Sequence, residues 1–178
     1  MDTELNEVVQ RIVEYMALSV KTAPKARGID FVGVKIVKGD ELKKLAEAMI
    51  EYGKKNNKAN YDRDGKNVMD SDAVLLLSLR MDTQPPGLNC GACGKERCAD
   101  LDPKEGQEFM GPLCAWRLLD LGVALGSAVK TASNFNLDNR IMYRAGAAAR
   151  KMGFMEGQII VGIPVSARGK NIYFDRQL

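Results

Sequence analysis

AVLLLSL, residues 73–79, is a continuous apolar run that directly follows the polar residues Asp70, Ser71 and Asp72. A short run of this kind, rich in Leu, is typical of a strand that is buried on both faces. We therefore predict a central strand at about residues 72–79. The rest of the chain is interpreted around this strand.

The part of the chain before the central strand contains two predicted helices and one further strand. Residues 29–37 alternate between apolar and polar side chains like a strand, and residues 41–53 are predicted to form a helix. Residues 54–67 are predicted to be a polar loop. Residues 4–20 form the first helix, because their apolar residues recur at helical spacing: Leu5, Val8, Val9, Ile12, Val13, Met16 and Val20.

The part after the central strand begins with a long segment that shows neither helical nor strand periodicity. Residues 81–114 are rich in Gly, Pro, Asp and Cys, so we expect a functional loop organised by a ligand. Two helices follow, over residues 115–135 and, with Asp138 as the cap, over residues 139–153. A last buried strand is predicted at residues 158–165.

This order of elements predicts an α+β domain in which helices and a sheet form layers. Residues 1–80 and 115–178 are expected to be the two halves of one core, and residues 81–114 are expected to be an inserted iron-sulfur loop. A chain of 178 residues is long enough to bury a core of its own. Folding is therefore not expected to require a metal.

The charge distribution and the N-terminal sequence exclude several classes of partner. The net charge of +3 is spread along the chain without an arginine stripe, so we expect no nucleic-acid partner. The first residues, MDTELNEVVQRIVEYM, lack the pattern of a secretion signal. No apolar run approaches the roughly 18 residues that cross a bilayer, so we expect a soluble cytoplasmic protein without a membrane partner.

All four cysteines lie between residues 90 and 114, and the chain contains no histidine. Their spacing is C-x2-C-x4-C-x15-C, formed by Cys90, Cys93, Cys98 and Cys114. Such clustering is typical of a metal site rather than of scattered disulfides, and the lack of histidine excludes imidazole ligands. Three close thiolates and one remote thiolate predict a [4Fe–4S] cluster. A zinc site, a [2Fe–2S] site and a disulfide form are the alternatives, because each also uses cysteine pairs.

Residues around the cysteines are candidates for tuning such a cluster. A cluster of this type with four thiolates carries a net charge of about −2. Lys95, Arg97 and Arg117 are expected either to offset this charge or to be solvated loop cations. Cys114 directly precedes a predicted helix, whose positive end would then face the cluster. Trp116 is expected either to pack in the core or to shield the cluster from water.

The cysteine run resembles the CGxCGxxxC module of electron-transfer subunits in anaerobic metabolism. Across nearly the whole chain, the sequence resembles a family of uncharacterised ferredoxin-domain proteins of archaea and anaerobic bacteria. The segments that carry this resemblance are TAPKARGID (22–30), SDAVLLLSL (71–79), LNCGACG (88–94), GPLCAWRLLDLGVALGSAV (111–129) and VGIPVSARGKNIYFDR (161–176).

A fainter resemblance is to the FMN-dependent nitroreductases. It is carried by TAPKARG before the strand IDFVGV and by VGIPVSARGK at the last strand. The resemblance implies a nitroreductase-like fold, with FMN bound at a homodimer interface by Lys25, Arg27, Arg168 and Lys170. The chain departs from that family in lacking its N-terminal arginine-serine signature and its serine-containing turn.

Three functions are consistent with these observations. The first is electron transfer or a flavin-linked oxidoreductase activity, with a redox partner protein or a flavin as the partner. The second is a zinc-stabilised interaction module. The third is an iron-sulfur or redox sensor, whose loop at residues 81–113 becomes disordered when the cluster is lost.

Overall fold

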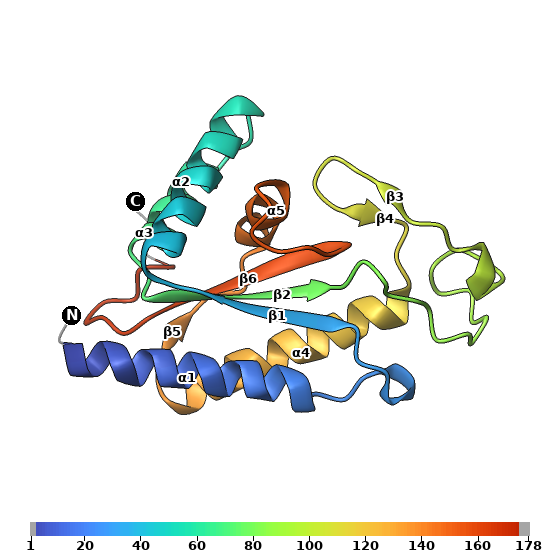
Figure 1. Cartoon of the computed structure of the whole chain (residues 1–178), viewed down its shortest axis with the longest axis horizontal. Coiled ribbons are helices and arrows are strands. Elements are labelled where there is room, and N and C mark those ends of the chain that lie inside the picture. Colours follow the sequence, from blue (N-terminus) through green and yellow to red (C-terminus); the bar gives the residue numbers. More distant parts are fainter. Residues whose placement is uncertain (1–2, 175–178) are drawn as a thin grey trace.

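The computed structural model describes residues 3–174 and shows a four-stranded antiparallel sheet between two layers of helices (Figure 1). The strands follow the order β1-β2-β6-β5 across the sheet. They span Val32–Val37 (β1), Ala73–Leu79 (β2), Asp138–Asn139 (β5) and Ile159–Ser166 (β6). The sheet therefore unites segments from the beginning, the middle and the end of the chain.

The central strand β2 is buried along its whole length. It pairs with β6 in a register that places Leu75 opposite Ile163. Leu75 packs toward one layer of helices, whereas Val74 and Leu76 pack toward the other, because successive side chains of a strand point to opposite faces. The prediction of a central strand buried on both faces is confirmed.

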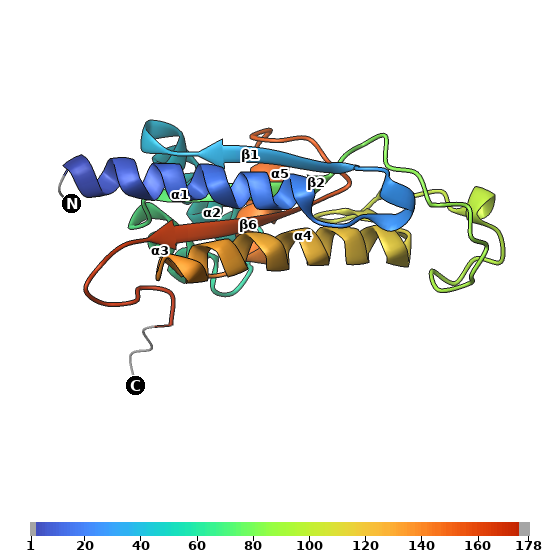
Figure 2. The same ribbon diagram turned by 90° about the horizontal axis from the view of Figure 1, so that it is seen from below.

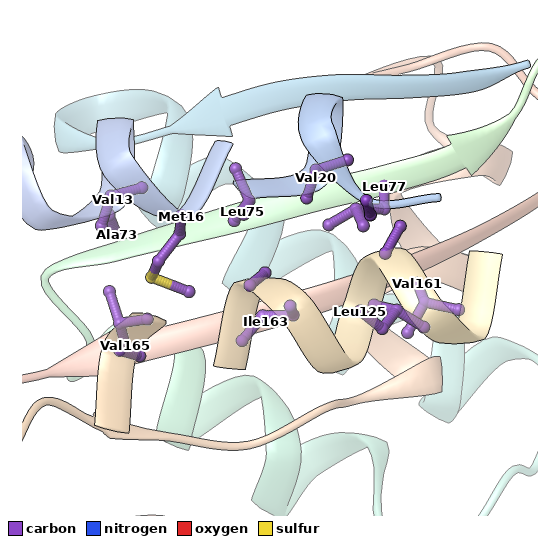
Figure 3. Packing of buried hydrophobic residues seen from close by; sticks show 14 of the residues in the cluster. Val13, Met16, Val20, Ala73, Leu75, Leu77, Leu125, Val161, Ile163 and Val165 are labelled. Atoms are coloured by element: carbon purple, nitrogen blue, oxygen red, sulfur yellow. The ribbon is translucent and has the colours of Figure 1, made fainter. Parts of the chain in front are cut away.

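One face of the sheet is covered by the helices α1 (Thr3–Thr22) and α4 (Ala115–Asn134), which lie side by side in Figure 2. Their apolar faces and the sheet form a core that includes Val13, Met16 and Leu125 (Figure 3). Full burial of an apolar side chain of this size stabilises a fold by about 1.5–3 kcal/mol. This layer fixes the direction of α4, whose N-terminal end carries the site described below.

The opposite face is covered by α2 (Gly39–Lys55), α3 (Tyr61–Met69) and α5 (Tyr143–Lys151). Helix α5 approaches β6 so closely that a Cβ atom added to Gly146 would lie 1.9 Å from the carbonyl oxygen of Ile160. Glycine is therefore required at this position by the packing of the helix on the strand.

Helix α3 differs from the sequence-based expectation, because the polar loop predicted at residues 54–67 contains its first seven residues. Its inward face buries Tyr61, Asp64 and Val68. The carboxylate of Asp64 is fully buried and pairs with a guanidinium nitrogen of Arg144 at 2.9 Å. The buried positions recur at helical spacing, but the helix has only nine residues and most of them are polar, so the sequence analysis interpreted the segment as a loop.

The segment around Asp138 also differs from the expectation. Asp138 was expected to cap a helix, but it lies in the two-residue strand β5 and pairs with Ser166 of β6. Helix α5 begins four residues after the predicted start, with Met142 at its N-cap. A strand of two residues has no periodicity from which it could be predicted.

The segment between β2 and α4 contains little regular structure, as the sequence predicts. It forms a short 3₁₀ turn at Cys98–Asp100 (η2) and a hairpin of the strands β3 (Lys104–Glu105) and β4 (Met110–Gly111). Figures 1 and 2 show that it projects beyond the N-terminal end of α4. Within residues 3–174, none of the helices combines the length and apolarity that crossing a bilayer requires.

Candidate metal centre

Cys90 and Cys93 lie on one tight turn. The N–H of Gly94 donates to the carbonyl oxygen of Gly91 at 2.9 Å, and both glycines have positive φ angles of 75° and 79°. Glycine adopts such angles readily because it has no Cβ atom. The two glycines therefore allow the chain to fold back within four residues and to present both thiols to the same hollow.

Asn89 attaches the third cysteine to this turn. Its side-chain oxygen accepts a hydrogen bond from the N–H of Cys98 at 2.8 Å, and its own N–H donates to the Cys98 sulfur at 3.3 Å. Asn89 has a φ of 48°, in the left-handed region that asparagine tolerates better than most residues. The sequence analysis did not identify Asn89, although its position directly before the C-x2-C pair was the available signal.

Cys114 occupies the N-cap position of α4 and is 7% exposed. Its carbonyl oxygen accepts the N–H of Leu118 at 3.0 Å, which begins the helical hydrogen bonding. The free N–H groups and the positive dipole end of the helix therefore lie next to this thiol, where they favour an anion. The prediction that Cys114 directly precedes a helix is confirmed.

All four cysteines line one hollow, and none of them forms a disulfide. The cavity volume of the hollow is about 10 Å³. This is far below the roughly 300–1,000 Å³ of pockets that bind organic ligands. The lining is completed by Pro86, Leu88, Gly91, Ala92, Lys95, Ala115 and Trp116.

The four thiols line the hollow without forming a compact single-ion site. Within residues 3–174, no three side chains of the types Cys, Asp and Glu are arranged to hold one metal ion.

Trp116 closes the hollow on the side of Cys90. Its indole N–H donates to the Cys90 sulfur at 3.3 Å, and the side chain is 41% exposed, so the ring lies at the surface rather than in the core. The pKa of the Cys90 thiol is lowered, first by the backbone N–H of Ala92 and then by this indole N–H. Of the two roles expected for Trp116, the structure favours shielding of the thiol.

The three cations expected to offset the charge of a cluster lie in different surroundings. Lys95 lines the hollow. Arg97 is exposed and pairs with Asp100 at 2.7 Å. Arg117 is not a solvated loop cation, because its guanidinium is buried and donates to the carbonyl oxygen of Gln84 at 2.8 Å.

Arg117 instead anchors the segments that support the cysteine loop. Besides Gln84, it binds the carbonyl oxygens of Ala26 and Ile29, both at 3.2 Å. Asp120 accepts a hydrogen bond from Arg117 at 2.9 Å and another from the N–H of Ala26 at 2.7 Å. The first turn of α4 is thereby tied to the short 3₁₀ turn at Ala26–Gly28 (η1) and to the chain that leads into the cysteine loop.

The β3–β4 hairpin is attached to the helices on the other face of the sheet. Glu105 accepts hydrogen bonds from both terminal nitrogens of Arg150, at 2.6 and 2.7 Å, and from Lys151 at 2.9 Å. Glu108 accepts a hydrogen bond from the hydroxyl of Tyr61 at 2.7 Å. These contacts hold the chain in place just before it reaches Cys114.

Two of the four cations predicted to contact a flavin lie beside the cysteine loop. Lys25 is buried, and its amine donates to the carbonyl oxygen of Ala23 at 2.8 Å, at the C-terminal end of α1. Arg27 donates to the carbonyl oxygen of Pro86 at 2.8 Å. Both side chains therefore stabilise local backbone in the single chain.

The other two cations lie at the far end of the sheet. Arg168 donates to the carbonyl oxygen of Asp70 at 3.0 Å, and the exposed Lys170 follows it. Arg168 comes shortly after the C-terminal end of β6. Arg27 comes shortly before β1, whose first residue pairs with the last residue of β2. The two arginines therefore lie at opposite ends of the sheet. About 25 Å of strand separates these ends, at roughly 3.3 Å per residue. One chain alone therefore does not bring the four cations together around one phosphate.

Sequence comparison supplies a match to one family model and one relative of known sequence. Residues 110–176 match the model of a family described as "Uncharacterized protein containing a ferredoxin domain". This segment includes Cys114 but not the other three cysteines. An "Uncharacterized protein" of Archaeoglobus fulgidus is 43% identical over 173 residues, which cover 96% of this chain and 93% of the relative.

Structure comparison shows that the fold is nitroreductase-like. Nitroreductase CinD from Lactococcus lactis in complex with nicotinic acid gives a TM-score of 0.63 at 10% identity, covering 95% of this chain and 83% of that chain. The FMN-dependent nitroreductase NfnB from Mycobacterium smegmatis in complex with NADPH gives a TM-score of 0.60 at 10% identity, covering 92% and 80%. At these identities the likeness concerns the fold alone.

Proposed function

The chain belongs to the family of uncharacterised proteins containing a ferredoxin domain, and on that premise we propose that it is an iron-sulfur electron-transfer protein. It binds one [4Fe–4S] cluster through Cys90, Cys93, Cys98 and Cys114. The observation that carries this proposal is the single hollow lined by all four thiols. Four cysteine thiolates are the usual ligands of such a cluster.

The donor set fits this group better than it fits zinc. The cysteines are free thiols, and their spacing of C-x2-C-x4-C-x15-C lacks the second close pair that is typical of structural zinc sites. Hydrogen bonds from the indole of Trp116 and from the N–H of Asn89 reach two of the sulfurs. Such donors stabilise thiolate ligands and hold them in a fixed orientation.

When bound, the cluster supplies one-electron chemistry. The residues around it determine on which side electrons enter and leave and how far water has access. Cys90 is exposed whereas Cys114 is buried, so electrons enter and leave on the side of Cys90. Trp116 covers part of this side and limits the access of water. Arg117 keeps the surrounding chain in one conformation.

For the flavin-linked form of this function we propose FMN as a second cofactor, bound between two copies of the chain. The nitroreductase-like fold supports it. The two pairs of cations, Lys25 with Arg27 and Arg168 with Lys170, lie at opposite ends of the sheet, so a shared flavin site requires a homodimer. If no flavin is bound, the cluster exchanges electrons with a redox partner protein instead.

The test of the electron-transfer proposal compares cysteine variants with a variant that lines the same hollow. Cys114→Ser and Cys98→Ser, purified without oxygen, are expected to lose most of their iron and the absorbance near 400 nm that dithionite bleaches (an approximate position). Leu88→Ala is the control, because Leu88 lines the hollow without being a ligand, and it is expected to retain iron. Equal iron in all four proteins would contradict the proposal.

The flavin proposal is tested separately by releasing and quantifying bound flavin from the wild-type protein and from Arg168→Ala. We expect flavin in the wild-type protein, less in the variant, and a dimeric mass in solution. Iron-loaded protein that is monomeric and free of flavin would refute the flavin-linked form and leave the cluster proposal standing.

A further inference from the structure

Cys90 differs from the other three thiols in its surroundings. It is exposed, and its sulfur accepts the indole N–H of Trp116 at 3.3 Å. The two residues are separated by 26 positions in the sequence and come from different elements, a glycine-rich turn and the first turn of α4. This contact therefore joins the two parts of the chain that supply the ligands.

Trp116 is a side-chain donor to a candidate ligand sulfur, whereas the donors from Ala92 and Asn89 are backbone N–H groups. A backbone donor cannot be removed by substitution without changing the fold of the turn. The indole N–H can be removed alone, because Phe retains an aromatic ring of similar shape without the N–H group. A substitution of Trp116 by Phe therefore tests the effect of the hydrogen bond while an aromatic ring still shields the thiol.

We propose that Trp116 is a positioning residue that raises the reduction potential of the cluster by donating to Cys90, an inference that rests on the proposed function. A cluster gains negative charge when it takes up an electron, so an N–H donor to a ligand sulfur stabilises the reduced form more than the oxidised form. Removal of the donor makes reduction less favourable and the potential more negative.

The experiment is an anaerobic redox titration of the full chain with dithionite as the electron donor. We expect Trp116→Phe to show a ratio of reduced to oxidised centres about three- to tenfold lower at a fixed potential, which for a one-electron couple corresponds to a shift of ~30–60 mV to more negative values. The control is Leu119→Ala, which changes another exposed apolar residue of α4 that does not line the hollow. Its potential is expected to equal that of the wild-type protein.

A second measurement covers the case in which Trp116→Phe does not retain its cluster. The chain has a single tryptophan, so an isotope-labelled indole nitrogen reports on Trp116 alone. In the dithionite-reduced wild-type protein we expect a hyperfine coupling between this nitrogen and the unpaired spin of the cluster. An absent coupling would overturn the inference.

The outcomes separate this inference from the proposed function. An unchanged potential in an iron-loaded Trp116→Phe variant overturns the role of Trp116 and leaves the cluster in place. Wild-type protein that contains no iron and sulfide overturns the proposed function, and the role of Trp116 with it.

Discussion

The guanidinium of Arg117 donates to the carboxylate of Asp120 at 2.9 Å, with side chains only 2% and 10% exposed. The pair spans the first two turns of α4, the helix that begins directly after Cys114. It connects this end of α4 to backbone carbonyls of two other segments. The fold thus uses a buried ion pair to fix the base of the cysteine loop.

We predict that Arg117→Met lowers the free energy of unfolding by about 3–5 kcal/mol, because it leaves the carboxylate of Asp120 buried without its cation. Urea unfolding followed by circular dichroism measures the change. Arg97→Met is the matched control, because Arg97 belongs to an exposed pair with Asp100, and such pairs contribute little. Equal losses of unfolding free energy in the two variants would contradict a stabilising role for the buried ion pair of Arg117.

The approach of α5 to β6 gives a second prediction. Gly146→Ala places a Cβ atom 1.9 Å from the carbonyl oxygen of Ile160, and we expect a loss of about 3 kcal/mol because backbone must move. Gly126→Ala is the control, because no atom lies within 4 Å of its added Cβ. In a helix this change is expected to stabilise by about 0.5–1 kcal/mol. A tolerated Gly146→Ala would contradict the packing of α5 on the sheet.

The hairpin contact of Glu105 predicts a pH dependence. Hydrogen bonds from Arg150 and then from Lys151 lower the pKa of Glu105 to about 2, from the ordinary value of 4.5. Because the folded-state pKa is depressed, the stabilisation is complete above about pH 4.5 and is lost as the pH falls toward 2.

Urea unfolding of the wild-type protein and of Glu105→Gln at several pH values tests this dependence. The wild-type protein is expected to be the more stable at pH 7, with the difference shrinking as the pH falls through this window. Glu7→Gln on α1, far from the hairpin in sequence, is the control and should show no such trend. A difference that is independent of pH would argue against the ion pair.

Removal of the metal is predicted to loosen only part of the cysteine loop. Residues 87–101 carry three of the four ligands and are largely exposed, whereas Glu105 and Glu108 attach the hairpin to the helices. Limited proteolysis with trypsin should therefore cleave metal-free protein after Lys95 or Arg97 and spare these sites in the loaded protein. Equal cleavage rates with and without metal would count against a loop ordered by its ligand.

Sequence patterns predicted the parts of the fold whose side chains alternate or repeat regularly. The apolar run at residues 73–79 and the helical spacing of residues 4–20 correspond to β2 and α1. Helix α3 was missed because it is short and mostly polar, with Asp64 and Gly65 at two of its four buried positions. Strand β5 was missed because it has two residues, too few for a periodicity.

The candidate site, like the fold, was predicted from the sequence only in part. The spacing of the cysteines identified the group that lines the hollow. The contacts that hold it, from Asn89 to Cys98 and from Trp116 to Cys90, depend on how distant segments meet. The burial of Arg117 depends on the same arrangement, which is why the sequence did not predict it.

Quantification of iron, acid-labile sulfide and zinc in wild-type protein purified without oxygen tests most directly whether four thiolates hold one cluster. We expect about four iron and about four sulfide per chain, with zinc well below one. One zinc per chain without iron or sulfide, or protein that holds none of the three after anaerobic reconstitution with iron and sulfide, would contradict the proposed function.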